Sequence, residues 1–222
     1  MEKGIVKARL KKWILFGIIY ISCFGIIEKR VVDFHVIHTA LDDRIPFCEY
    51  FVIPYLLWFL YVGVTILYFC MLNPSQKESD DFFSCFFMGS AVFFMISLVY
   101  PNVQNLRPAY IGEGFWAGLV KLIYLTDTPT NILPSLHVYN SVVCLAAIMR
   151  NKSCRKRKWL ITGVGILTVS IILSTMLIKQ HSVVDVMMAL LFNVIFYYVV
   201  YRMPENEQYA AWKNRRKKVQ QI

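Results

Sequence analysis

Two histidines at the start of apolar segments are the residues of this chain best suited to chemistry. His137 ends the run LPSLH at 133–137, and His181 lies in the run KQHSVVD at 179–185. Ionisable side chains are costly in hydrocarbon, so a histidine at the end of a membrane segment indicates a functional role. Asp185 follows His181 by four residues, and on a helix the two side chains share one face. We therefore expect a proton-transfer and nucleophile pair.

Each polar group near these histidines has a chemical interpretation. The Asp185 carboxylate can hold one ring nitrogen of His181 and leave the other nitrogen free to attack. An imidazole titrates near neutrality, which suits His137 to protonate a leaving alkoxide as general acid. The Ser135 hydroxyl and the free N–H groups at a helix start would hold a phosphate, and Arg107 offers a planar fork of donors. Together these groups predict phosphoryl transfer through a phosphohistidine.

A metal centre is the alternative interpretation of the same residues. His137, His181 and Asp185 could form a zinc triad, but no pattern such as HExxH accompanies them. A second cluster, DFHVIH at 33–38, has spacing that is only weakly typical of a metal site, and we interpret it as solvated loop residues. We therefore predict neither a metal nor a cofactor.

The composition places these residues in a membrane protein. The chain has 222 residues, and 57% of them are hydrophobic, against roughly 45–50% in an ordinary soluble domain. The formal net charge of +10 does not indicate nucleic acid, because the basic residues cluster between apolar runs and act as topology signals. We predict a single integral membrane domain over 1–222.

Six apolar stretches qualify, or nearly qualify, as membrane helices. A hydrocarbon core about 30 Å thick needs roughly 17–25 apolar residues per helix. The stretches cover 13–27, 51–72, 82–100, 136–149, 159–178 and 183–201, of which the first and fourth are short. We expect an all-α bundle of six transmembrane helices. The small residues at 89–91, together with Gly163 and Gly165, offer surfaces for close helix contact.

The charge distribution sets the orientation. With the N-terminus inside, 18 of the 24 lysine and arginine residues lie on the inner side. The positive-inside rule therefore predicts cytoplasmic N- and C-termini and a basic cytoplasmic tail at 205–222. The long segments 28–50 and 101–134 then lie outside, and the apolar run at 115–125 is expected to form an interfacial helix. Both histidines face the outside of a multi-pass protein, which we place in the plasma membrane.

These residues resemble the type 2 phosphatidic acid phosphatase superfamily, whose membrane enzymes have six helices. The motifs of that superfamily are K-x6-RP, PSxH and SR-x5-H-x3-D. The present chain reads Y-x6-RP at 100–108, PSLH at 134–137 and ST-x5-H-x3-D at 174–185. The resemblance extends over about 51–201, the predicted core of the domain.

The resemblance implies a role for each matching residue. His181 would be the nucleophile, Asp185 its orienting partner and His137 the general acid. Arg107 and Ser135 would bind phosphate. These roles agree with the chemistry expected from the residues themselves.

Two positions depart from the superfamily pattern. Tyr100 stands where the first motif has lysine, and Thr175 stands where the third has arginine. We keep Tyr100 as a candidate substrate-binding residue, and we expect Lys179, two residues before His181, to supply a replacement cation. The pattern around these positions resembles the branch near the inositol phosphorylceramide synthases, whose members can transfer a phospho-headgroup from a lipid to an alcohol.

The sequence thus predicts a membrane lipid phosphatase that cleaves a phosphate ester through a phosphohistidine at the outer membrane face. A phosphotransferase that moves a phospho-headgroup between lipids is the alternative, and a non-enzymatic transporter of the same fold is a third candidate. The expected partners are a phosphorylated lipid and the membrane, without nucleic acid. The oligomeric state, the lipid headgroup and its acceptor stay open.

Overall fold

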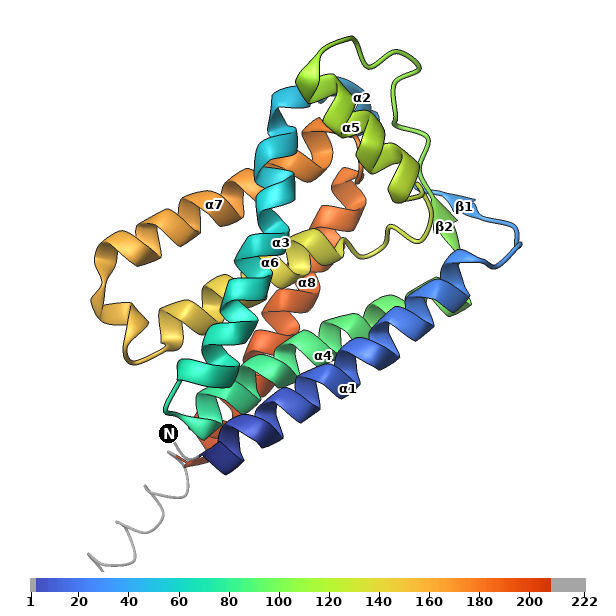
Figure 1. Cartoon of the computed structure of the whole chain (residues 1–222). Coiled ribbons are helices and arrows are strands. Elements are labelled where there is room, and N and C mark those ends of the chain that lie inside the picture. The colour runs from blue at the N-terminus through green and yellow to red at the C-terminus, as the bar shows by residue number, and fades with distance from the viewer. Residues whose placement is uncertain (1–2, 209–222) are drawn as a thin grey trace, which may run out of the picture.

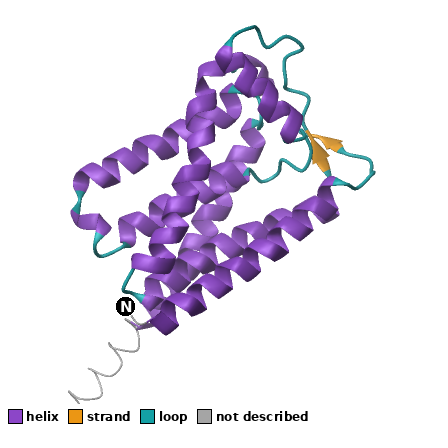
Figure 2. Cartoon of the chain, in the orientation of Figure 1, coloured by secondary structure: helices purple, strands orange, loops and turns teal. Residues whose placement is uncertain are grey.

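The computed structural model describes residues 3–208, and helices make up most of them (Figures 1 and 2). The α-helices are α1 (Lys3–Glu28), α2 (Ala40–Arg44), α3 (Val52–Leu67), α4 (Gln76–Val99), α5 (Phe115–Thr126), α6 (Leu136–Arg150), α7 (Lys158–Leu177) and α8 (Val183–Tyr197). Short helical turns of other types are η1 (Glu49–Phe51), η2 (Tyr68–Leu72), η3 (Cys154–Lys156) and η4 (Tyr198–Arg202). Strands β1 (His35–Val36) and β2 (Asn102–Val103) form a parallel pair.

Within residues 3–208, five helical segments are long and apolar enough to cross a membrane. They are Lys3–Glu28, Glu49–Leu72, Gln76–Val99, Lys158–Leu177 and Val183–Gln208. The chain is therefore an all-α, multi-pass membrane protein, as predicted.

The predicted fourth span is a shorter helix than the others. Helix α6 has 15 residues, which extend only about 22 Å at 1.5 Å per residue, less than the hydrocarbon thickness. It packs against α3, α4, α7 and α8 at the centre of the bundle (Figure 1). Because neighbouring helices cover most of it, α6 does not need the length of a lipid-facing span.

Serine residues cap the N-terminal ends of α6 and α8, the two helices next to the histidines. Ser135 precedes α6 and accepts a hydrogen bond from the Val138 N–H, and Ser182 precedes α8 in a capping box with Asp185. These side chains satisfy backbone donors that have no partner within the helix. The sequence therefore fixes where α6 and α8 begin, and with that the positions of both histidines.

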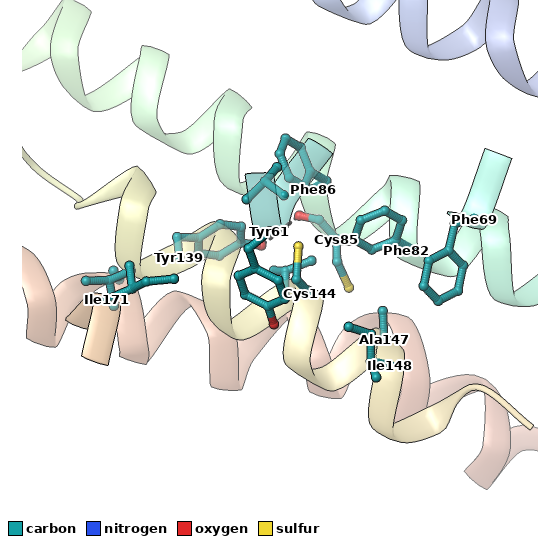
Figure 3. Close-up of a cluster of buried hydrophobic side chains, with 14 of the residues drawn as sticks. Tyr61, Phe69, Phe82, Cys85, Phe86, Tyr139, Cys144, Ala147, Ile148 and Ile171 are labelled. Atoms are coloured by element: carbon teal, nitrogen blue, oxygen red, sulfur yellow. Dashed lines mark hydrogen bonds between the residues drawn. The ribbon is translucent and has the colours of Figure 1, made fainter. Parts of the chain in front are cut away.

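Aromatic and small side chains fill the core between α3, α4, α6 and α7 (Figure 3). Gly89 is essential to this packing, because a Cβ at that position would lie 1.9 Å from Cε1 of Tyr139. The close contact predicted at 89–91 is thus confirmed for Gly89. The contact expected at Gly163 and Gly165 is wrong, since an added Cβ there meets no described atom within 4 Å.

Buried polar side chains join the helix turns at the end of the bundle where the N-terminus lies. Nδ2 of Asn151 donates to Oδ1 of Asn73 at 3.1 Å and to Glu78 at 2.7 Å, and Nδ2 of Asn73 donates to Ser79 at 3.1 Å. Arg9 donates to the Asn73 carbonyl at 2.7 Å. We call these five residues the turn network. It connects α1, the α3–α4 turn and the end of α6.

Two other predicted segments have different outcomes. The run at 115–125 is helical, as expected, and forms α5. The predicted tail at 205–222 is helical over 205–208, and its remainder lies outside the described residues.

Candidate active site

The two predicted histidines lie next to each other at the N-terminal ends of α6 and α8. The ring centroids of His137 and His181 are 5.9 Å apart. The Ser135 N–H donates to the Asp185 carbonyl at 3.2 Å, which joins the starts of the two helices directly. Segments more than forty residues apart in the sequence thus form one site.

Asp185 orients His181. Nδ1 of His181 lies 3.2 Å from Oδ2 of Asp185, and the Ser182 N–H donates to the same oxygen at 2.8 Å. Asp185 is fully buried and His181 nearly so. With a proton on Nδ1, Nε2 carries the free lone pair, which is the arrangement a nucleophilic imidazole needs.

His137 lies between aromatic rings. The ring centroid of Tyr55 is 4.4 Å from that of His137, and the ring centroid of Trp58 is 4.3 Å away. Nε2 of His137 is buried without a hydrogen-bond partner among the described residues. Because buried polar atoms in proteins are normally paired, this nitrogen is available to a ligand.

Ser135 is fully buried and is occupied as a helix cap. Its hydroxyl accepts from the Val138 N–H at 3.4 Å. The first turn of α6 presents its other N–H groups at the same place, and such groups favour an anion. Ser135 thus caps α6 next to His137, and its role in phosphate binding stays a prediction.

Arg107 binds protein oxygens next to the histidines. Its guanidinium donates to the carbonyls of Tyr124 at 3.1 Å and Asp127 at 2.7 Å, and to Oε1 of Gln180 at 2.7 Å. It also lies 4.3 Å above the Tyr124 ring. Burial lowers the pKa of Arg107, although the charge of Asp127 opposes this shift. Arg107 thus joins the end of α5 to the residue that precedes His181.

A cavity of about 530 Å³ lies in front of both histidines. Its polar lining includes His137, His181, Gln180, Asp127 and Asn131. Its apolar lining comes from α1, α3, α4, α5 and α6 and includes Tyr20, Phe24, Leu56, Phe59, Phe93, Leu122 and Leu136. A ligand with a polar head and an apolar chain fits such a surface.

None of the four predicted substrate-binding residues lines this cavity: Arg107 and Ser135 adjoin residues that do, whereas Tyr100 and Lys179 contact other parts of the protein. Tyr100 stacks on the ring of His35, with centroids 4.3 Å apart. The Lys179 ammonium donates to the carbonyls of Asp42 at 2.7 Å and Ile45 at 2.5 Å. Burial lowers the pKa of Lys179, while Asp42 and Asp43 oppose the shift. The geometry therefore gives no support to a direct substrate contact by Tyr100 or Lys179.

Thr175, which stands where the superfamily has arginine, does not line the cavity either. It is fully buried, and its hydroxyl donates to the Ile172 carbonyl at 2.8 Å within α7. The Arg107 guanidinium donates a hydrogen bond to Gln180, a polar residue of the cavity lining. Among residues 3–208, no other arginine or lysine side chain donates a hydrogen bond to a polar lining residue.

Asp42 positions the start of α8 and was missed by the sequence analysis. Its carboxylate accepts from the Ser182 hydroxyl at 2.7 Å, the Val183 N–H at 2.8 Å and the Thr39 N–H at 2.8 Å. Burial raises the pKa of Asp42, but these donors outweigh it, and the net shift is downward. The pattern T-x-x-D at 39–42 indicates a local helix start, but it does not indicate a partner 140 residues away.

Asp127, Asn131 and Gln180 were also missed, since no motif contains them. Burial raises the pKa of Asp127, although the charges of His181 and Arg107 and the Tyr55 hydroxyl oppose this shift.

Between residues 3 and 208, no group of three His, Cys, Asp or Glu side chains could hold a metal ion. The residues at 33–38 instead make loop contacts, such as the one between His35 and Tyr100.

The fold and the site define a multi-pass helical membrane protein with two histidines and a carboxylate at one amphipathic cavity. Residues 102–209 match the model of the PAP2 superfamily, and this part of the chain is a PAP2 superfamily domain. Members of that superfamily are typically phosphatases. The match contains Arg107 and both histidines, and it does not indicate the branch near the inositol phosphorylceramide synthases. Neither the curated proteins nor the solved structures contain a match to this chain.

Proposed function

We propose that this protein cleaves or transfers the phosphate ester of a membrane lipid through a phosphohistidine on His181. The observation that carries the proposal is the pairing of His181 Nδ1 with Asp185 at 3.2 Å while His137 lies beside His181 at the same cavity, with 5.9 Å between the ring centroids. Nε2 of His181 would attack phosphorus, and His137 would protonate the departing alkoxide. The N–H groups at the start of α6 would hold the phosphate oxygens.

The cavity supports a lipid as the substrate. Its walls are mostly apolar side chains from several helices, and its polar end carries the two histidines. A lipid could place its chain between these walls and its phosphate at His181. The excess of basic residues on the opposite side, including 150–158, supports an active site on the outer face under the positive-inside rule. Helix α6 would then be the sixth membrane-embedded helix.

Transfer to an alcohol is the second candidate, and the charge of the site favours it over hydrolysis of a monoester. A phosphate monoester carries about two negative charges near neutrality, and superfamily members bind it with additional cations. Here Tyr100 and Thr175 replace those cations, and most Arg107 donors contact protein oxygens. Asp127 adds a carboxyl group to the same cavity. A phosphodiester, with a single charge, suits this environment better.

A panel of lipids tests both candidates. Purified protein in mixed micelles is given phosphatidic acid, phosphatidylinositol and other phospholipids, with and without a chelator, and the products are identified by mass spectrometry. Inorganic phosphate indicates hydrolysis, and a new phosphodiester lipid indicates transfer.

His181→Ala should abolish turnover, and His137→Ala should lower it by about 10²–10⁴-fold, the contribution of a general acid. Glu113→Gln, an exposed change in the same outer segment, should retain turnover and serves as the matched control. The proposal fails if turnover survives both histidine substitutions. Movement of lipid across vesicles without any phosphate chemistry would support the transporter instead.

A further inference from the structure

Three polar residues at the cavity have no role in the chemistry described so far. Asp127 ends α5, Asn131 lies in the segment before α6, and Gln180 precedes His181. All three line the cavity that contains both histidines. We propose that Asp127, Asn131 and Gln180 form a hydroxyl-binding subsite that holds the alcohol acceptor beside His181. The inference rests on the proposed function, because the acceptor reacts with a phosphohistidine.

Arg107 and Tyr55 fix the position of Asp127 relative to the histidines. One guanidinium nitrogen of Arg107 donates to the Asp127 carbonyl and to Gln180 Oε1, both at 2.7 Å. The Tyr55 hydroxyl donates to Oδ2 of Asp127 at 3.4 Å, while its ring stacks on His137. Arg107 thus links Asp127 to Gln180, the residue that precedes His181. Tyr55 links Asp127 to the ring of His137.

Asn131 and Gln180 supply unused hydrogen-bonding atoms. Asn131 is 5% exposed and Gln180 is 3% exposed, so both are buried. Nδ2 and Oδ1 of Asn131 and Nε2 of Gln180 have no hydrogen-bond partner among the described residues. A buried unpaired polar atom costs about 1–3 kcal/mol, so such a group in a native protein needs an explanation. A ligand that both donates and accepts hydrogen bonds would supply the missing partners.

The chemistry of the three side chains selects a hydroxyl over a second phosphate. An ionised carboxylate repels phosphate oxygens but accepts a hydrogen bond from a hydroxyl, and neutral amides can bind a hydroxyl as donor or acceptor. Three threonines close to Asp127 in the sequence, Thr126, Thr128 and Thr130, line the same cavity, whereas the rings of Tyr55 and Trp58 pack against His137. The departing lipid alcohol would thus lie near His137, and a water-soluble or headgroup alcohol would approach from Asp127.

The second step then has a defined proton path. The acceptor oxygen forms a bond to phosphorus as the bond from phosphorus to Nε2 of His181 breaks, and the imidazole recovers its lone pair. The acceptor proton moves to the Asp127 carboxylate, which later releases it to water. Burial raises the pKa of Asp127, and a carboxylate of higher pKa is a stronger base near neutral pH.

Decay of the phosphoenzyme tests the subsite. Wild-type protein and the Asp127→Asn variant react in micelles with dioctanoyl phosphatidic acid carrying a ³²P label. The acid-labile label on the protein is then followed after a chase with unlabelled lipid, in water alone and with added glycerol or myo-inositol. In the variant, the label should form at the wild-type rate but decay about 10²–10³ times more slowly. The wild-type decay rate should rise with pH through the raised pKa of Asp127, and the variant should lose this rise.

Three controls separate the role of Asp127 in acceptor activation from one in folding. Glu113→Gln should decay like the wild type, and Asp127→Glu, which keeps the carboxylate, should decay faster than Asp127→Asn. Trifluoroethanol, an alcohol acidic enough to need little help from a base, should accelerate decay in Asp127→Asn relative to ethanol. Normal label formation with unchanged decay in Asp127→Asn would overturn the subsite alone. A wild-type protein that forms no label from phosphatidic acid or from ³²P-labelled phosphatidylinositol would overturn the proposed function as well.

Discussion

The cavity and the turn network both bury asparagine side chains, but only the turn network pairs them. Asn151 is 1% exposed, and its side chain bonds to Asn73, Glu78 and the N–H groups of Ser153 and Cys154. Asn131 is 5% exposed, and both of its side-chain polar atoms are unpaired among the described residues. Asparagine therefore stabilises the fold in the turn network, whereas at the cavity its side chain is available to bind a ligand.

This difference distinguishes polar groups that hold the fold from polar groups that await a ligand. The unpaired atoms of His137, Asn131 and Gln180 all belong to residues that line one cavity. Buried polar atoms without a hydrogen-bond partner among the described residues also occur away from the cavity, at Arg30, Ser97 and Asn140, but four of the residues that carry such atoms, Trp58, Asn131, His137 and Gln180, line it. The protein thus tolerates unpaired groups where a substrate would supply the partners, at a cost of about 1–3 kcal/mol each in its absence. Substitutions in the two regions should separate activity from stability.

The largest expected effect comes from His137→Phe. A phenyl ring keeps the stacking between Tyr55 and Trp58 and removes the unpaired nitrogen, so thermal stability should be retained or raised. Turnover of the lipid substrate should fall by about 10²–10⁴-fold, the contribution of a general acid. Turnover by mass spectrometry and thermal unfolding in detergent measure the two effects. A stable variant that retains turnover would remove His137 from the mechanism.

Asp42→Asn should affect both activity and stability. The amide would present a donor to the hydroxyl and N–H groups that now donate to the carboxylate. We expect the free energy of unfolding to fall by about 1.5–3 kcal/mol, the range for hydrogen bonds to charged groups, and turnover to fall because α8 carries Asp185.

The pH dependence of Asp42→Asn gives a second readout. The pKa of Asp42 is lowered in the folded protein, so its stabilising contribution is complete above the unfolded pKa. That contribution disappears as the pH falls through the lowered folded pKa. Thermal unfolding at a series of acidic pH values should therefore show a loss of stability in the wild type that is smaller in the variant. Equal acid sensitivity in both proteins would contradict the anchoring role of Asp42.

A matched pair of asparagine substitutions gives the smallest but most selective effect. Asn151→Ala should lower the free energy of unfolding by about 1–3 kcal/mol because it leaves buried partners unpaired, with turnover at saturating lipid unchanged. Asn131→Gly removes only side-chain atoms that lack partners, and glycine adopts the φ of 52° at this position without strain, so stability should hold while turnover with an alcohol acceptor falls. Thermal unfolding and product analysis of both variants test the comparison. A reversed pattern would show that unpaired atoms do not mark the functional end.

Much of this arrangement could be predicted from local sequence signals. Apolar length predicts the long helices, and serine caps with the spacing of His181 and Asp185 predict a histidine–carboxylate pair on one face. The proximity of His137 to His181 follows from placing both helix starts at the same membrane face. These features depend on residues close in the sequence or on the limited geometry of a membrane bundle.

The remaining features depend on contacts between distant segments. Nothing near Lys179 indicates that its ammonium binds the carbonyls of Asp42 and Ile45. The glycine pattern does not distinguish Gly89, which faces Tyr139, from Gly163, which faces open space. Asn131 and Asn151 are the same residue type, and only tertiary structure separates the unpaired side chain from the paired one.

The most direct test of the account is to locate the phosphate on the protein during turnover. The wild type is mixed with a phospholipid substrate, quenched in alkali that preserves phosphohistidine, digested and mapped by mass spectrometry. We predict phosphate on Nε2 of His181, and none in a His181→Asn variant that retains its fold by thermal unfolding. Phosphate on another residue, or lipid turnover by His181→Asn, would contradict the account.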